Sequence, residues 1–153
     1  MKTLVLGLGN PILSDDSVGI RVARAVESRL DQPEVTVQET SMAGLTLLDL
    51  VVGYDRVILI DAILTTEGKP GQIYRLEREA FDTTRHATTS HDINFATALE
   101  LGQRLGLALP QQIIIFAIEV VNVDSFGEEC TPAVERAIPV VADMVMAELA
   151  TSS

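Results

Sequence analysis

The stretch GLGNPILSDDSVG at residues 7–19 places glycines, an Asn-Pro pair and two adjacent acids between two apolar runs. Glycine tolerates positive φ and proline fixes the φ of a turn, so the stretch predicts a chain reversal. The apolar run before it, residues 3–8, has the length of a buried strand. A strand that turns here into a helix presents the turn at the carboxyl edge of a sheet, where open α/β folds place their sites.

The segment after the turn has the apolar periodicity of a helix over residues 16–30. Apolar residues recur from Val18 to Leu30 at helical spacing, and charged residues occupy the opposite face. Ser14 or Asp15 is expected to cap this helix, because a short polar side chain can accept a hydrogen bond from the first-turn amides. Acids in the first turn also suit the helix dipole.

The rest of the chain alternates between strand and helix patterns. Strands are predicted at residues 35–39, 56–60, 72–76 and 112–118, and helices at residues 43–52, 93–105 and from Thr131 onward. This alternation, without repeat or linker, predicts one α/β domain over residues 1–153. We expect three layers, with about five strands in a mostly parallel sheet and helices on both faces.

Several details of this layout are also predicted. The strand at 56–60 is expected to end at Asp61, and the strand at 112–118, the most hydrophobic, to lie near the sheet centre. The strand at 35–39 is expected near an edge, and 72–76 is an edge-strand candidate, antiparallel if it forms a hairpin. Residues 79–90 are polar and lack a period, which indicates a surface loop. Pro139 is expected to kink or split the last helix.

The composition excludes several classes of function. The formal net charge is −11, and the 11 basic residues are scattered, so nucleic acid is not expected as a partner. No apolar run is long enough for a membrane span and no secretory signal pattern is visible, which predicts a cytoplasmic protein without membrane contact. Nothing in the sequence calls for an obligate interface, so a monomer is expected. Cys130 is the only cysteine. The adjacent acids would raise its thiol pKa, so it is interpreted as a half-buried small residue rather than a nucleophile.

Ionisable residues follow or precede the predicted strands at the edge where the turn lies. Taken singly, each has an ordinary structural interpretation: cap or first-turn acid for Asp15 and Asp16, turn cap for Asp61, first-turn residue for His91, strand end for Glu119. Because carboxyl ends of parallel strands meet at one edge, we expect two carboxylates and one imidazole to converge there. Such an oxygen–oxygen–nitrogen site suits a divalent metal such as Ni²⁺ or Zn²⁺, with a fourth position open.

Two known motifs begin like the glycine turn. The dinucleotide-binding pattern G-x-G-x-x-G lacks its third glycine here, and Asp15 and Asp16 oppose a pyrophosphate. The letters Gly-Leu-Gly-Asn-Pro resemble the opening of bacterial peptidyl-tRNA hydrolase. That resemblance implies a glycine after the proline and a catalytic histidine soon afterwards, whereas Ile12 follows Pro11 and the first histidine is His86.

A longer pattern resembles another family. The chain reads Gly7-x-Gly9-Asn10-x-x-x-x-Asp15-Asp16-x-x-Gly19, then has an apolar strand followed by Asp61, and then Ser90-His91. In this order the motifs resemble the NiFe-hydrogenase maturation endopeptidases, over nearly the whole chain. The resemblance implies an α/β domain with a five-stranded twisted sheet between helices. It also implies removal of a C-terminal extension from the hydrogenase large-subunit precursor after nickel insertion.

Carried over to this sequence, the family's metal-contacting positions fall on Asp16, Asp61 and His91, which are also the expected catalytic residues. Many relatives have Glu where this chain has Asp16. Asn10 and Glu119 are candidate substrate-binding supports at the same edge. Nickel is expected to arrive with the substrate, and other divalent metals can occupy such a site. A nickel-binding chaperone or checkpoint factor that docks on the hydrogenase without cutting it remains the alternative.

Overall fold

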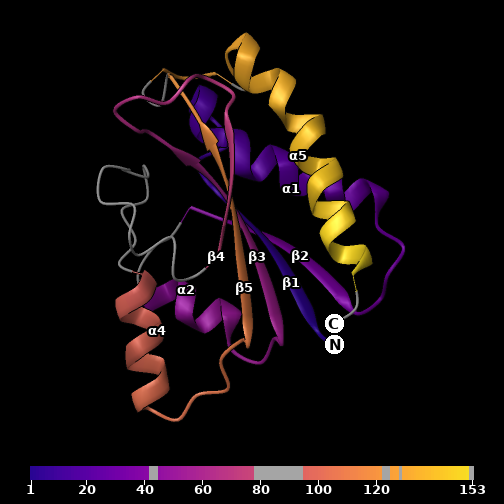
Figure 1. Cartoon of the computed structure of the whole chain (residues 1–153), viewed down its shortest axis with the longest axis vertical. Coiled ribbons are helices and arrows are strands. Elements are labelled where there is room, and N and C mark those ends of the chain that lie inside the picture. Colours follow the sequence, from indigo (N-terminus) through magenta and orange to yellow (C-terminus); the bar gives the residue numbers. More distant parts are fainter. Residues whose placement is uncertain (42–44, 78–94, 122–124, 128, 152–153) are drawn as a thin grey trace.

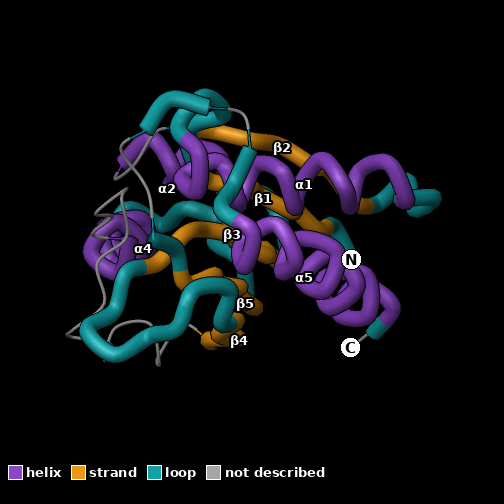
Figure 2. The backbone as a smooth tube through the Cα atoms, turned by 90° about the horizontal axis from the view of Figure 1, so that it is seen from above, coloured by secondary structure: helices purple, strands orange, loops and turns teal. Residues whose placement is uncertain are grey.

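Five strands form a twisted sheet in the computed structural model, which describes residues 1–41, 45–77, 95–121, 125–127 and 129–151. The strands are β1 (Thr3–Leu8), β2 (Val35–Thr40), β3 (Arg56–Ile63), β4 (Ile73–Glu77) and β5 (Gln112–Glu119). Their order is β2-β1-β3-β5-β4, as Figure 2 shows from above. All neighbours pair in parallel except β4, which is antiparallel to β5. The predicted α/β class and mostly parallel sheet are confirmed.

Helices cover both faces of this sheet (Figure 1). The helices α1 (Val18–Arg29) and α5 (Pro132–Ala150) lie on one face, and α2 (Leu45–Val51) and α4 (Phe95–Arg104) lie on the other. Alternate residues of each strand feed the two resulting cores: Ile58 and Ile60 pack with the α1–α5 cluster, whereas Val57 and Leu59 pack with the α2–α4 cluster. The result is the predicted three-layer domain.

The strand ends differ from the sequence prediction. The central strand is β3, and β5 lies beside it, near the sheet centre as expected. β3 also continues through Asp61 to Ile63, because β5 pairs with it as far as Glu119. The strand β4 lies at an edge, as expected. It is antiparallel, but to β5 rather than through a hairpin with the preceding strand. The prediction of an edge position for β2 is confirmed.

Two helices also depart from expectation. Residues Ser14–Ser17 form a separate 3-10 turn, η1, before α1, and neither η1 nor α1 has a side-chain cap hydrogen bond. The last helix runs unbroken through Pro139, so the predicted split is wrong. Pro139 lies on the exposed face of α5, while Ile138 and Val141 beside it are packed in the core. A proline on the solvent side leaves the freed carbonyl accessible to water, and core packing holds both halves together.

The end of the sheet opposite the turn is held by Arg56. Its guanidinium donates to the hydroxyl of Thr3 at 3.2 Å and to the carbonyls of Glu148 and Thr151 at 3.1 and 2.9 Å. The beginning and the end of the chain therefore lie at this amino end of the sheet (Figure 1). Within the part of the chain that the structure describes, no helix combines the length and apolarity needed to span a membrane. The loop predicted at 79–90 lies outside the described residues.

Candidate active site

The turn after β1 lies directly on the ends of β1 and β3 because glycine occupies the contact positions. Gly9 has a φ of +154°, and a Cβ there would overlap the carbonyl oxygen of Asp16. A Cβ on Gly19, in the first turn of α1, would overlap the carbonyl oxygens of Leu8 and Ile60. Side chains at these two positions would push the turn outward. The glycines of residues 7–19 thus mount η1, which carries Asp16, on the carboxyl edge of the sheet.

Asp16 and Asp61 lie at this same edge. The amide of Asp16 donates to the Leu13 carbonyl at 2.7 Å, its carbonyl accepts from the Asn10 amide at 3.3 Å, and η1 packs against β3. Asp61 follows Ile60, the β3 residue level with Gly7, and its Oδ1 accepts from the Ala62 amide at 2.8 Å. The two acids are only 3% and 4% exposed.

Two carboxylates at one buried edge are oxygen donors of the kind that hold divalent cations. Their role as metal contacts and catalytic residues stays a prediction. His91, the expected nitrogen ligand, lies outside the described residues. Among the residues that are described, no group of three or more His, Cys, Asp or Glu is placed to hold a metal ion. Of the three predicted metal ligands, the structure therefore describes only the two carboxylates, Asp16 and Asp61.

Asp15 has a different role from the cap that was expected. Its side chain is fully buried, and its carboxylate accepts hydrogen bonds from two segments that lie far away in the sequence. The Thr131 amide donates to Oδ1 at 2.6 Å, the Thr131 hydroxyl contacts both oxygens at 3.1 and 2.9 Å, and the Val121 amide donates to Oδ2 at 3.0 Å. Thr131 is the N-cap of α5, as predicted, but its hydroxyl bonds to Asp15 rather than to its own helix.

A second set of contacts joins the turn to Gly127 and Glu129. Ser14 has a φ of +30°, an uncommon value for a residue other than glycine. Its amide donates to the Gly127 carbonyl at 2.9 Å, and the Gly127 amide donates to the Ile12 carbonyl at 2.8 Å. The Ser14 hydroxyl donates to the Glu129 carbonyl at 3.1 Å. These contacts of the Ser14 backbone and hydroxyl hold the strained residue in place.

Cys130 lies behind the turn and is not poised as a nucleophile. Its thiol lies 3.6 Å from the Ser17 hydroxyl and 3.5 Å from the Ser14 carbonyl. Burial raises the pKa of the thiol, and the nearby Arg21 guanidinium does not reverse that shift. The interpretation as a small structural residue is supported, although burial, rather than the neighbouring acids, is the main cause of the shift.

The two candidate substrate supports are both engaged in local structure. Asn10 accepts a hydrogen bond from the Ile12 amide at 3.2 Å, which closes the turn. The buried carboxylate of Glu119 accepts from the Thr65 amide at 2.9 Å, the Thr65 hydroxyl at 2.6 Å and the Tyr74 hydroxyl at 3.0 Å. Burial raises the pKa of Tyr74, so that phenol stays protonated as a donor. Glu119 thereby anchors the segment between β3 and β4; contact with substrate stays a prediction for both residues.

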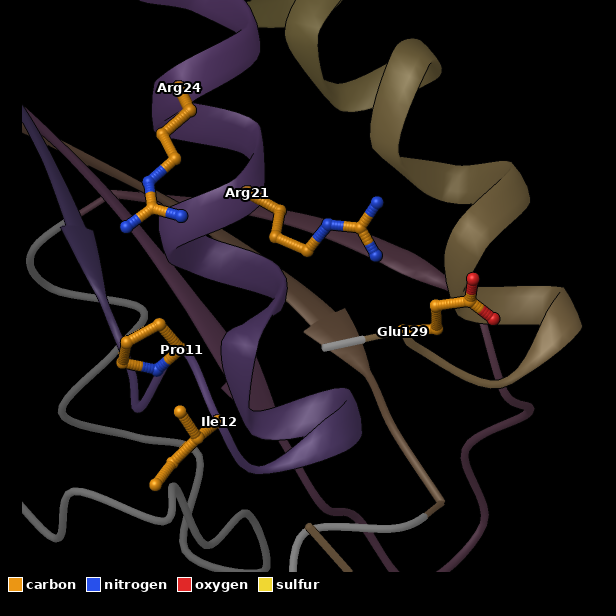
Figure 3. Close-up of a pocket in the computed structure, with 5 residues that line it drawn as sticks. All are labelled: Pro11, Ile12, Arg21, Arg24 and Glu129. Carbon is orange, nitrogen blue, oxygen red and sulfur yellow. The ribbon is translucent and has the colours of Figure 1, made fainter. Parts of the chain in front are cut away.

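A hollow of about 520 Å³ opens beside the turn (Figure 3). Pro11 and Ile12 line it from the turn, Arg21 and Arg24 from α1, and Glu129 from the segment before α5. The helical periodicity of α1 predicts only that these two arginines lie on its solvent-exposed face. Nothing local in the sequence signals that the exposed face of α1 borders the turn.

Exposed apolar side chains also gather around this edge. Ile12, Val121 and Phe126 are 52%, 57% and 83% exposed. Ile12 and Phe126 belong to paired segments, since the Gly127 amide bonds to the Ile12 carbonyl. Val121 follows β5, and its amide bonds to Asp15. Apolar groups left in water near a site favour contact with another protein.

The fold and these residues define an α/β protein whose candidate site is formed by buried acids at the carboxyl ends of its parallel strands. The family model for hydrogenase maturation protease (HycI) matches residues 20–148. The chain therefore belongs to the hydrogenase maturation protease family, which places it among the hydrolases with endopeptidase activity. The family predicted from the motifs is confirmed.

Individual relatives agree with the family. The chain is 28% identical over 154 residues to "Hydrogenase 2 maturation protease" of Escherichia coli (strain K12), with 99% of this chain and 93% of the relative covered. It is similar to the solved structure of hydrogenase maturating endopeptidase HybD from Escherichia coli at 28% identity, with a TM-score of 0.83, 97% of this chain and 92% of that chain covered. The NiFe hydrogenase maturation protease HybD from Thermococcus kodakarensis gives a TM-score of 0.73 at 26% identity, covering 99% and 100%.

Proposed function

We propose that this protein removes the C-terminal extension of a NiFe-hydrogenase large-subunit precursor after nickel has been inserted. Nickel that is already bound to the precursor serves as the recognition element. The observation that carries this proposal is the placement of two buried acids, Asp16 and Asp61, at the candidate edge of a hydrogenase maturation protease fold. We assign the third contact with the nickel to His91.

The roles of these residues follow from their chemistry. Carboxylate oxygens and a neutral imidazole can share the substrate's nickel with the ligands that the precursor supplies. Binding of the substrate's metal holds the adjacent peptide segment at the carboxyl edge of the sheet, which lowers the entropic barrier to hydrolysis of that segment. Hydrolysis adds the hydroxyl of water to the carbonyl carbon, breaks the C–N bond and leaves the remaining proton on the amine. A carboxylate at this edge can accept the proton from the attacking water.

Other features of the molecule support a protein substrate. The exposed apolar side chains around the turn suit a protein surface, and the hollow beside Pro11 and Ile12 gives a peptide segment a place to leave the edge. The net charge of −11 opposes nucleic acid. We further propose that the protein works as a monomer in the cytoplasm, without a membrane partner.

The decisive experiment compares nickel-loaded and nickel-free precursor. Purified protein is mixed with each form, and the mass of the precursor is followed by mass spectrometry. Loss of the extension from the loaded form alone supports the proposal. Binding without any loss of mass supports the alternative, a nickel-binding chaperone or checkpoint factor. Release of peptide from peptidyl-tRNA would instead support an activity like that of peptidyl-tRNA hydrolase, which the letters Gly-Leu-Gly-Asn-Pro resemble.

Substitutions then test the site. Asp16→Asn and Asp61→Asn keep the size of each side chain and remove its charge, so cleavage of the loaded precursor should fall at least about 100-fold if both grip the nickel. Asp143→Asn is the matched control, because Asp143 is an exposed acid on α5 that pairs with Arg29. Normal cleavage by either site variant would show that the assigned residue does not act.

A further inference from the structure

We propose that Asp15 is a positioning residue, whose carboxylate fixes the neighbouring Asp16 by tying η1 to the segments that follow β5 and begin α5. This inference rests on the proposed function, because Asp16 is the group that it positions. The motif resemblance assigns a metal contact to Asp16 and gives no role to Asp15. The hydrogen bonds of Asp15 in the structure indicate its role.

The tie is made of charge-assisted hydrogen bonds inside the protein. Asp15 is completely buried, and three donors from outside its own turn approach it: the amide and hydroxyl of Thr131 and the amide of Val121. Hydrogen bonds to an ionised carboxylate are stronger than those between neutral groups. They connect the turn to residues 106 and 116 positions away in the sequence.

The geometry of η1 separates the directions of the two acids. A 3-10 helix has about three residues per turn, so consecutive side chains project about 120° apart. With Asp15 directed toward Thr131 and Val121, Asp16 cannot also face those segments. Rotation of η1 about its axis would move both side chains together, and the hydrogen bonds of Asp15 oppose that rotation. The direction of Asp16 is therefore set by Asp15.

The contacts within the turn do not supply this restraint. The amide of Asp16 donates to the Leu13 carbonyl and its carbonyl accepts from the Asn10 amide; both partners belong to the turn, so these two bonds move with it. Ser14 connects the turn to Gly127 and Glu129, which lie four and two residues before the α5 N-cap, Thr131. Asp15 instead bonds to Thr131, the N-cap residue of α5. A displaced Asp16 would offer its oxygen at the wrong place to a metal already fixed by the precursor.

The test uses variants that loosen the tie without touching Asp16. Thr131→Val removes the hydroxyl that contacts both Asp15 oxygens and keeps the Thr131 amide and the charge of Asp15. Asp15→Asn removes the charge and presents a donor where an acceptor is needed. Thr3→Val is the matched control, because it removes a buried hydroxyl hydrogen-bonded to Arg56 at the opposite end of the sheet. Thermal unfolding of every variant shows whether Thr3→Val loses as much stability as the two variants at the turn.

Three readouts are compared in the full-length protein. Amide hydrogen exchange of residues 13–17, measured by NMR, reports the turn without metal or substrate. Calorimetric titration with Ni²⁺ alone measures the affinity for the metal, and kcat/KM for the nickel-loaded precursor measures cleavage. For Thr131→Val and Asp15→Asn we expect faster exchange in the turn and a loss of about 10–100-fold in Ni²⁺ affinity and cleavage, the usual effect of removing a residue that orients a metal ligand. Thr3→Val should leave all three unchanged.

The outcomes separate this inference from the proposed function. If Thr131→Val exchanges its turn amides at the wild-type rate, or loosens the turn while binding Ni²⁺ and cleaving as Thr3→Val does, the positioning role is wrong. The double variant Asp15→Asn/Thr131→Val should lose no more Ni²⁺ affinity and cleavage than Asp15→Asn alone. Additive losses would contradict the proposal that the two residues act through one set of hydrogen bonds. If the wild-type protein neither binds Ni²⁺ nor cleaves the precursor, the proposed function fails, and amide exchange alone then decides whether Asp15 holds the turn.

Discussion

Replacement of Gly7 by alanine tests whether the glycines of the turn are there to let α1 approach the strands. Gly7 lies in β1, where a Cβ would come 2.5 Å from the Gly19 carbonyl oxygen and 2.8 Å from the Cβ of Ala23. Ordinary contacts begin at 3.4 Å, so the first turn of α1 must move outward by about 0.9 Å. Forcing a methyl group into a packed contact costs about 1–3 kcal/mol.

The same displacement should reach the candidate site. Asp16 lies three residues before Gly19, at the junction of η1 and α1, so it moves with the start of the helix. A misplacement of about 1 Å at an active site can lower the rate about 100-fold. Gly7→Ala should therefore unfold at a lower urea concentration, with an unchanged m value, and cleave the nickel-loaded precursor far more slowly than its stability loss explains.

Gly106→Ala is the control for this prediction. Gly106 has a φ of +74°, and an added Cβ there meets nothing within 4 Å. Alanine at such a φ costs about 1–2 kcal/mol without displacing any neighbour. If both variants lose similar stability but only Gly7→Ala loses cleavage, the close approach of α1 matters for the site. A Gly7→Ala variant as stable and active as the wild type would refute the reasoning.

Further predictions concern the titratable groups and the anchored acid. Burial raises the pKa of the Cys130 thiol, so iodoacetamide should label the native protein at pH 8 much more slowly than the urea-unfolded chain, as followed by mass; equal rates would contradict its burial. The two hydrogen bonds from Arg24 lower the pKa of Glu39 below its ordinary 4.5, so their stabilisation is present above that pH and is lost as the pH falls through the lower folded value. The pair is exposed, so Arg24→Ala should lower the free energy of unfolding at pH 7 by no more than about 1 kcal/mol, with a smaller difference at pH 3; a larger loss at pH 3 would reverse the sign. Glu119→Gln places an amide among donors from Thr65 and Tyr74, which should cost about 1–3 kcal/mol in urea unfolding; unchanged stability would mean that these hydrogen bonds are not made.

The fold could be predicted because its signals are local. Apolar spacing along α1 and short apolar runs at β1 and β3 survive in the structure, since each reports which face of one element meets the core. Strand ends were predicted less well. The continuation of β3 beyond Asp61 depends on pairing with β5, which lies about fifty residues later and leaves no mark near Asp61.

The candidate site could be predicted in part for a similar reason. Parallel topology alone indicates that Asp16 and Asp61 share an edge, and the structure places them there. The hydrogen bonds from Thr131 to Asp15 join residues 116 positions apart and leave no local pattern, so the sequence alone predicts only a helix cap at Asp15. The hollow beside Ile12 was missed because its walls come from the turn, the exposed face of α1 and the segment before α5.

The hydrogen bonds of Arg56 have a practical consequence. Because this guanidinium ties Thr3 to Glu148 and Thr151, a tag joined to either terminus emerges at the amino end of the sheet. The Asp16 edge lies at the other end, so a large precursor can approach without meeting the tag. Immobilisation through either terminus should therefore present the same face to a captured partner.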